Sequence, residues 1–302
     1  MKIRILLKSF VMFSLAFLVK IFRYRKYKNN LRVLIFHNIN EINIQKFENL
    51  INSLSKNWNF VTPHQFDLFM RNKLSLKGNN LLITFDDGFK SSYKAIKNVL
   101  EPKSIKSIVF IATNFISCGN NQKKCLDFIL NNLKEKNFKY SFADELFPMD
   151  FRDMADLKLN GNIIGSHTCS HINLIELSKN NLISELILSK KFLEQELSIK
   201  ISEFAYPYGN ENSISSSIYN QCLNTYSRVY SGCRGNNKPE NNFIFRDTIT
   251  LDEPLFYVKS SGSRFCLIIY SIINKNVITL VLSFSRRKSV KTCIVVASVR
   301  YV

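Results

Sequence analysis

Short apolar runs rich in β-branched and aromatic residues alternate along this chain with longer stretches whose apolar residues recur at helical spacing. Such alternation predicts an α/β fold with parallel strands, because each helix carries the chain back to the end of the sheet where it started. Residues 119–148 are polar and irregular and read as an insertion with one or two helices. The predicted strands lie at 31–36, 81–85, 108–112, 163–164 and 204–206, and the predicted helices at 46–56, 90–100, 150–159, 180–197 and 214–223.

The basic charge of the chain is concentrated at its two ends. Residues 1–30 and 254–302 each hold eight Lys or Arg and no acidic residue, so removing these sixteen charges reduces the formal net charge from +19 to +3 for residues 31–253. A nucleic-acid-binding domain carries its basic face on the folded part. The positive and negative charges of residues 31–253 nearly balance, which argues against nucleic acid as a partner. Because 46% of the 302 residues are hydrophobic, a disordered chain is also excluded.

The first residues predict contact with a membrane. An apolar run at 10–19 lies between Lys8 and Lys20, basic residues follow it, and no small-residue cleavage site is evident. We therefore expect residues 1–30 to form an uncleaved anchor that spans the bilayer or lies in its interface. The alternative is an amphipathic helix packed on the domain. An anchor implies a membrane-associated protein of the cell envelope, and the sequence does not decide which side of the membrane the domain faces.

Residues 31–257 form the predicted catalytic domain, and the basic tail at 258–302 is of a different character. Its apolar runs fit extra strands, a membrane-contacting segment or a sequence altered by a frameshift. The seven cysteines are odd in number and match no zinc-binding spacing, so most are expected to be free, buried thiols.

Polar residues follow several of the predicted strands at the point where each strand ends. His37 follows the first strand, Asp86 and Asp87 the second, and His167 and His171 a later one. In folds of this kind, sites lie at the carboxyl ends of parallel strands. These side chains are therefore expected to converge on one site.

The adjacent carboxylates of Asp86 and Asp87 repel each other unless a cation compensates them. A divalent ion would do so, with one carboxylate as a ligand and the other left as a base. His167 and His171 are four residues apart and can face one ion if their segment is helical or a tight turn. One carboxylate with two imidazoles and open positions suits zinc, or a similar ion such as cobalt or nickel.

Three motifs, in this order, make the chain resemble the polysaccharide deacetylases, which are carbohydrate esterase family 4 with the nodulation-type deacetylase domain. They are TFDDG at 84–88, HTCSH at 167–171 and YPYG at 206–209, supported by IFHNI at 35–39 and by residues 149–177. The resemblance spans roughly residues 31–255. It implies a distorted (β/α) barrel and the hydrolysis of N-acetyl, less often O-acetyl, groups on the sugars of a polysaccharide.

The resemblance also implies roles for individual residues. Asp86 corresponds to the general base and Asp87 to a metal ligand. His167 and His171 correspond to the other two ligands. The backbone N–H of Tyr208 would help to hold the oxyanion.

This sequence departs from the common family pattern at two places. The third motif often has an arginine that orients the base, and Ala205 stands at that position here. In this respect the segment resembles the poly-N-acetylglucosamine deacetylase branch. Arg246 is our candidate for the residue that supplies the guanidinium instead. No histidine follows His171, although the family usually has a catalytic acid near its carboxyl end. The same branch resembles a permuted arrangement in which an early strand supplies this histidine. We therefore assign the acid role to His37, which follows the first predicted strand.

Two other functions compete with the deacetylase interpretation. A catalytically weak glycan-binding protein would keep the fold, and the missing arginine favours it. A membrane-tethered binder of anionic polymers would use the basic ends, and its binding would depend strongly on salt but not on metal.

Overall fold

The computed structural model describes residues 29–134, 146–249 and 251, together with the backbone of three strands between 266 and 300. The predicted membrane anchor at 1–30 lies almost wholly outside the described residues. In the part that is described, no helix is long and apolar enough to cross a membrane.

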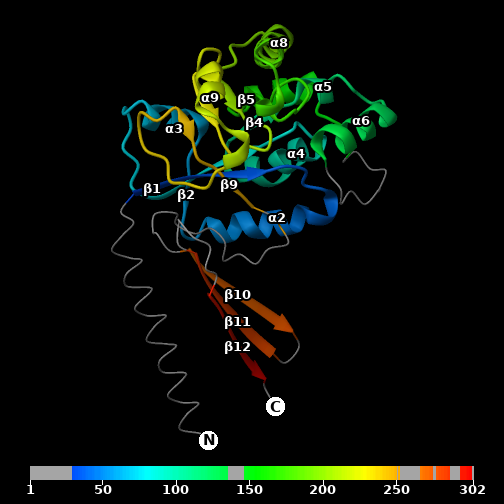
Figure 1. The fold of residues 1–302 in the computed structure, drawn as a ribbon. Helices are drawn as coiled ribbons and strands as arrows, with labels where there is room; N and C mark the ends of the chain where they lie inside the picture. The colour runs from blue at the N-terminus through cyan, green and yellow to red at the C-terminus, as the bar shows by residue number, and fades with distance from the viewer. Residues whose placement is uncertain are drawn as a thin grey trace, which may run out of the picture.

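A parallel sheet of nine strands forms the centre of the fold (Figure 1). Its order is β8-β7-β6-β5-β4-β3-β1-β9, with β2 paired to β3, and the strand pairs are parallel. This confirms the predicted α/β class with parallel strands. The strands are β1 (Asn29–Phe36), β2 (Asn59–Phe60), β3 (Gly78–Phe85), β4 (Ser107–Ile111), β5 (Ile163–Ser166), β6 (Glu203–Ala205), β7 (Arg228–Tyr230), β8 (Phe243–Ile244) and β9 (Asp247–Thr248).

The sheet curls toward a barrel because its two edges are neighbours in the sequence. β8 pairs with β7 at one edge and β9 pairs with β1 at the other, yet only residues 245–246 separate β8 from β9. Three steps along an extended chain cover about 11 Å at most. The two edges must therefore approach each other, which gives the distorted (β/α) barrel that the sequence predicted.

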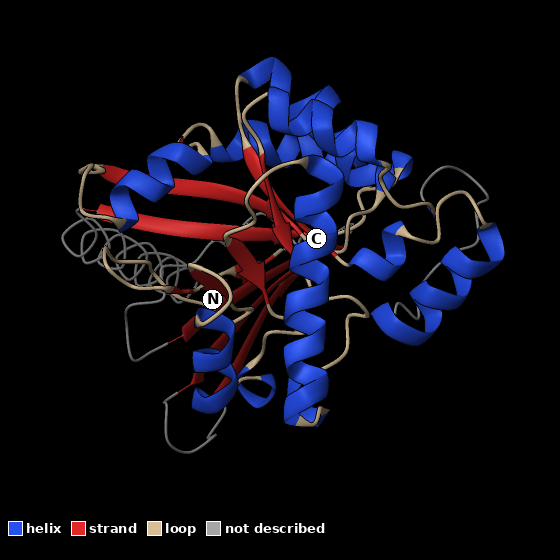
Figure 2. Ribbon diagram, turned by 90° about the horizontal axis from the view of Figure 1, so that it is seen from above, coloured by secondary structure: helices blue, strands red, loops and turns tan. Residues whose placement is uncertain are grey.

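Helices surround the strands on the outside of the curled sheet (Figure 2). In α2 the side chains of Phe47, Leu50, Ile51 and Leu54 are buried, which is the apolar face that helical spacing predicts. The helices are α2 (Glu41–Leu54), α3 (Pro63–Met70), α4 (Lys90–Ala95) continued by a π-helical turn (Ile96–Leu100), α5 (Thr113–Ile116), α6 (Gln122–Phe128) continued by a second π-helical turn (Ile129–Leu133), α7 (Phe151–Leu159), α8 (Lys179–Leu197) and α9 (Ser216–Leu223).

The strands are apolar on both faces because both faces are covered. Neighbouring residues of one strand, such as Val33 and Leu34 in β1, belong to two different buried clusters. The cluster that contains Val33 is the inner cluster, and it also includes Phe110 and Tyr230 together with Phe66 and Met70 of α3. The outer cluster joins the sheet to the helices around it. Continuous apolar runs are the expected pattern for parallel strands buried in this way.

Several short elements were not expected from the sequence, among them β2, α5 and the strands β7 to β9. The described part of the insertion at 119–148 contains α6 and its π-helical turn, and residues 135–145 lie outside the described residues, so the prediction of one or two helices stays a prediction. In the tail, β10 (Cys266–Asn274), β11 (Val277–Ser285) and β12 (Cys293–Arg300) form an antiparallel sheet of their own. The five cysteines whose side chains are described are free thiols.

Candidate active site

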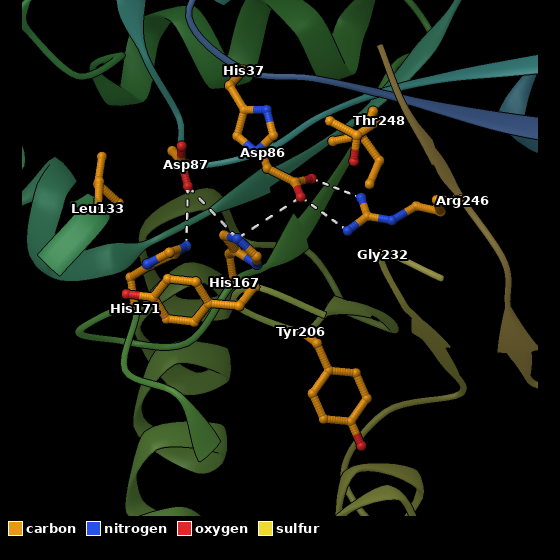
Figure 3. Close-up of a pocket in the computed structure, with 12 residues that line it drawn as sticks. His37, Asp86, Asp87, Leu133, His167, His171, Tyr206, Gly232, Arg246 and Thr248 are labelled. Atoms are coloured by element: carbon orange, nitrogen blue, oxygen red, sulfur yellow. Dashed lines mark hydrogen bonds and ion pairs between the residues drawn. The ribbon is translucent and has the colours of Figure 1, made fainter. Parts of the chain in front are cut away.

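A pocket of about 170 Å³ lies at the carboxyl ends of the central strands (Figure 3). The structure brings together in its lining all the residues that the sequence predicted for the site. These are His37, Asp86, Asp87, His167, His171, Tyr208 and Arg246, and they are joined there by Ile35, Leu133, Tyr206, Gly232 and Thr248.

Asp86 and Asp87 follow β3 and point in different directions because the chain turns sharply between them. Asp87 has a φ of +74° and Gly88 a φ of +94°, both in the left-handed region. Asp86 continues the ladder by donating its N–H to the Phe36 carbonyl at 2.9 Å. The Asp86 carboxylate faces Arg246, whereas the Asp87 carboxylate faces the two histidines (Figure 3).

His167 and His171 lie in an irregular loop after β5 rather than in a helix. Thr168 and His171 have φ values of +68° and +53°, which non-glycine residues rarely adopt. This loop lets both rings face the same point, with their centroids 4.8 Å apart. Of the two conformations that the spacing allowed, helix or tight turn, the structure shows the turn.

The tautomers of both histidines follow from their partners. His167 Nδ1 lies 2.8 Å from the Ala205 carbonyl oxygen and His171 Nδ1 lies 3.1 Å from that of Asn132. Because a carbonyl only accepts, each Nδ1 donates. Burial lowers the pKa of His167 to about 3 and also lowers the pKa of His171, so both rings are neutral near pH 7. Each Nε2 therefore presents a lone pair.

The two Nε2 atoms lie 3.6 Å and 3.4 Å from Oδ1 of Asp87. These separations are long for hydrogen bonds, but ligand atoms about 2.0–2.2 Å from a tetrahedral ion lie about 3.3–3.6 Å from one another. Two imidazole lone pairs and a buried carboxylate oxygen that converge in this way fit a divalent cation. A carbonyl behind each imidazole is the usual support of a metal-binding histidine.

Arg246 holds the other carboxylate. Its Nη1 and Nη2 donate to the two oxygens of Asp86 at 2.7 Å and 2.9 Å, and its Nε donates to the Ser231 carbonyl at 2.8 Å. The guanidinium also lies over the Phe110 ring. Burial alone would raise the pKa of Asp86, but the Arg246 charge and its hydrogen bonds lower that pKa to about 2. Asp86 is therefore ionised throughout the physiological range.

His37 and Tyr208 lie on two other walls of the pocket. His37 follows β1, and Ser92 Oγ donates to its carbonyl at 2.9 Å. Tyr208 has a φ of +62°, and its hydroxyl donates to the Asn132 carbonyl at 3.0 Å. Within residues 29–134 and 146–249, no backbone carbonyl accepts the Tyr208 N–H.

The insertion contributes groups to the site that were not predicted from the sequence. The Asn132 carbonyl accepts from both His171 and Tyr208, and Leu133 lines the pocket. The side chain of Asn132 contributes as well, because its Nδ2 donates to the Ser170 carbonyl at 2.8 Å. The two hydrogen bonds to the Asn132 carbonyl could not be read from the sequence, since any residue type supplies that group.

Comparison with known proteins bears on the fold and the family. A family described as Polysaccharide deacetylase matches residues 73–226. The matched segment contains Asp86, Asp87, His167, His171 and Tyr208, but neither His37 nor Arg246. "Putative polysaccharide deacetylase YxkH" of Bacillus subtilis (strain 168) is 24% identical over 188 residues, which cover 60% of this chain and 58% of that protein. The match thus spans less than two thirds of this curated relative.

Solved structures show the same fold. IcaB from Ammonifex degensii superposes with a TM-score of 0.60 at 19% identity, over 74% of this chain and 92% of that one. The Streptococcus pyogenes deacetylase PplD, in complex with acetate, gives 0.59 at 17% identity, over 74% and 94% of the two chains. A de-N-acetylase from Aggregatibacter actinomycetemcomitans gives 0.60 at 15% identity, over 75% and 97%.

Proposed function

This chain belongs to the polysaccharide deacetylase family, and from that premise we propose that it is a metal-dependent hydrolase that removes acetyl groups from the N-acetylated sugars of a polysaccharide. The observation that carries the proposal is the convergence of Asp87, His167 and His171, with Asp86 beside them. The three ligands would hold the ion and leave other positions open, as in catalytic zinc sites. Zinc is the ion we propose, and cobalt or nickel would suit the same donors.

A divalent ion there would polarise both a water molecule and the acetyl carbonyl, and so would compensate for the weak basicity of a carboxylate whose pKa is about 2. Asp86 would take a proton from the attacking water. Arg246 would keep Asp86 ionised and fix its direction through the two hydrogen bonds. The Tyr208 N–H would donate to the developing oxyanion.

The leaving amine needs a proton before the carbon–nitrogen bond breaks, and His37 would supply it. The products would then be acetate and the free amine of the sugar. An acid in this position matters more for an amide than for an ester, because an amine leaves poorly without protonation. A histidine in the pocket lining therefore favours N-acetyl over O-acetyl groups as the substrate.

Acetate release tests the proposed function directly. We expect the Zn²⁺-loaded protein to release acetate from poly-N-acetylglucosamine or chitooligosaccharides, and to release less from O-acetylated xylan. A chelator should abolish release, and added Zn²⁺ should restore it. If the Zn²⁺-loaded protein releases no acetate from any of these glycans, the proposal is wrong and the glycan-binding alternative gains support.

Replacing His37 with alanine tests the proton donor. We expect turnover of an N-acetylated glycan to fall by about 100-fold or more, the range for loss of general acid catalysis, whereas bound Zn²⁺ stays stoichiometric. Hydrolysis of an activated aryl acetate should fall much less, because that leaving group needs no proton.

His64→Ala is the matched control for this variant, since His64 is exposed on α3 and away from the pocket. It should leave both activities unchanged. Equal losses on the amide and the aryl ester in His37→Ala would remove the acid role from His37.

A further inference from the structure

The loop between the two histidines is held by the side chain of a residue on another element. Oε2 of Glu185 accepts the backbone N–H groups of Cys169 and Ser170 at 2.8 Å and 3.0 Å. Its other oxygen, Oε1, accepts the hydroxyl of Ser170. One carboxylate thus binds three donors within the segment that joins His167 to His171.

This carboxylate is attached to a rigid part of the fold. Glu185 lies on α8, whose buried residues Leu182 and Leu186 flank it. α8 packs on β5, the strand that leads into the loop (Figure 1). A hydrogen bond of 2.7 Å between Ser189 and Ser166 joins the helix to the end of that strand. Glu185 is therefore fixed relative to the strand from which His167 emerges.

The loop needs such support because its conformation is unfavourable by itself. Thr168 and His171 both have positive φ values, a strained conformation for non-glycine residues that persists only where the surrounding structure imposes it. Other hydrogen bonds to the backbone of the loop come from neutral partners. The Thr113 and Asn114 N–H groups donate to the Thr168 and Cys169 carbonyls, and the Asn132 side-chain amide donates to the Ser170 carbonyl. Glu185 adds charge-assisted hydrogen bonds, which are roughly twice as strong as neutral ones.

We infer that Glu185 is a positioning residue for the metal ligands, an inference that rests on the proposed metal-dependent function. Its carboxylate holds the loop in the observed conformation, in which the two Nε2 atoms lie 3.6 Å and 3.4 Å from Asp87 Oδ1. It contacts neither ring and would not contact the substrate. Its loss should therefore weaken metal binding rather than the chemical step.

The test is the dissociation constant for Zn²⁺ alone, measured by competition with a chromophoric chelator, together with turnover as a function of free Zn²⁺. We expect Glu185→Ala to bind Zn²⁺ about 10–100-fold more weakly, the range found when groups behind metal ligands are lost. At saturating Zn²⁺ its kcat should return to within a few-fold of wild type. Glu185→Asp, which keeps the charge but withdraws the carboxylate by one methylene, should also bind more weakly and covers the case in which the alanine variant fails to fold.

Two further variants separate positioning from general stability. Glu185→Gln should lose less Zn²⁺ affinity than Glu185→Ala, because its carbonyl oxygen can still accept both N–H groups and its amide can donate to Ser170, although these hydrogen bonds are no longer charge-assisted. Glu194→Ala, on the same helix, removes a carboxylate that accepts the Ile201 N–H at 2.9 Å far from the histidines. It should lower the melting temperature without changing Zn²⁺ affinity.

Wild-type affinity in both Glu185→Ala and Glu185→Asp would overturn the inference, and so would an equal loss of affinity in Glu194→Ala. These results leave the proposed function intact. If the wild-type protein itself bound no Zn²⁺, the proposed function and the inference would both be wrong.

Discussion

Replacing Asp87 with asparagine is expected to abolish Zn²⁺ binding and, with it, acetate release. The asparagine side chain has the shape of the carboxylate but carries no charge. It would place either its NH2 group, which is partly positive, or its carbonyl oxygen, which is a weak neutral ligand, opposite the two Nε2 lone pairs. We expect Zn²⁺ affinity to fall by more than about 100-fold, beyond the range for groups that only support ligands. The fold should persist, because asparagine tolerates the φ of +74° that Asp87 adopts.

Melting temperature with and without Zn²⁺ checks this expectation alongside acetate release. The metal-free variant should melt within a few degrees of the metal-free wild type, and only the wild type should be stabilised by Zn²⁺. Asp86→Asn is the matched control at the neighbouring position, since it should keep the Zn²⁺-induced stabilisation and lose turnover. A Zn²⁺-dependent rise in melting temperature in Asp87→Asn would contradict the assignment of Asp87 as a ligand.

Replacing Arg246 with methionine is expected to destabilise the fold and to shift the pH dependence of activity. Removing one partner of a buried ion pair leaves an uncompensated charge, which costs about 3–5 kcal/mol. Asp86 and Arg246 are 3% and 1% exposed, so this case applies. Burial raises the pKa of Asp86, and in the variant no guanidinium opposes that effect. The pKa of Asp86 should therefore rise.

The sign of the pH effect follows from the pKa of Asp86. In the wild type this pKa is about 2, below the ordinary value of about 3.9. The pair therefore stabilises the fold fully above the ordinary value, and this contribution is lost as the pH falls toward 2. In the variant, Asp86 takes a proton at higher pH, so the stability difference from wild type should be largest near pH 7 and shrink on acidification. The acidic limit of activity should move to higher pH, because the base must be ionised.

Urea unfolding between pH 4 and 7 and a pH–rate profile measure both effects. Arg71→Met is the matched control, because Arg71 is exposed and its pair with Asp67 should contribute no more than about 1 kcal/mol. The double variant Arg246→Met with Asp86→Asn should recover stability relative to Arg246→Met alone, since the charge of Asp86 is then no longer buried without its partner. A stability loss that is the same at every pH, with an unshifted rate profile, would contradict the role of Arg246.

Local patterns predicted most of the long elements because burial on a fixed face leaves a period in the sequence. The buried face of α2 is of this kind, whereas β3, which is buried on both faces, was recognisable by its continuous apolar run. β8 and β9 contain two residues each, which is too short for any period to appear. Yet these two strands close the sheet and bring Arg246 to the pocket, so the elements that position this arginine were the ones that no local pattern could reveal.

Local residue patterns were enough to identify the carboxylates and imidazoles that meet at the site. The residue types of the two aspartates and two histidines, and their position after apolar strands, are sufficient to predict a carboxylate–imidazole site at one edge of a parallel sheet. The partner of each of these groups, and the contacts that hold it in place, depend on the tertiary structure. Asp86 faces Arg246 because the two edges of the sheet approach each other. Both histidine rings face the same point because Glu185 holds their loop and the Asn132 carbonyl holds the ring of His171. Those contacts join residues between 15 and 160 positions apart, and only the folded chain brings such residues together.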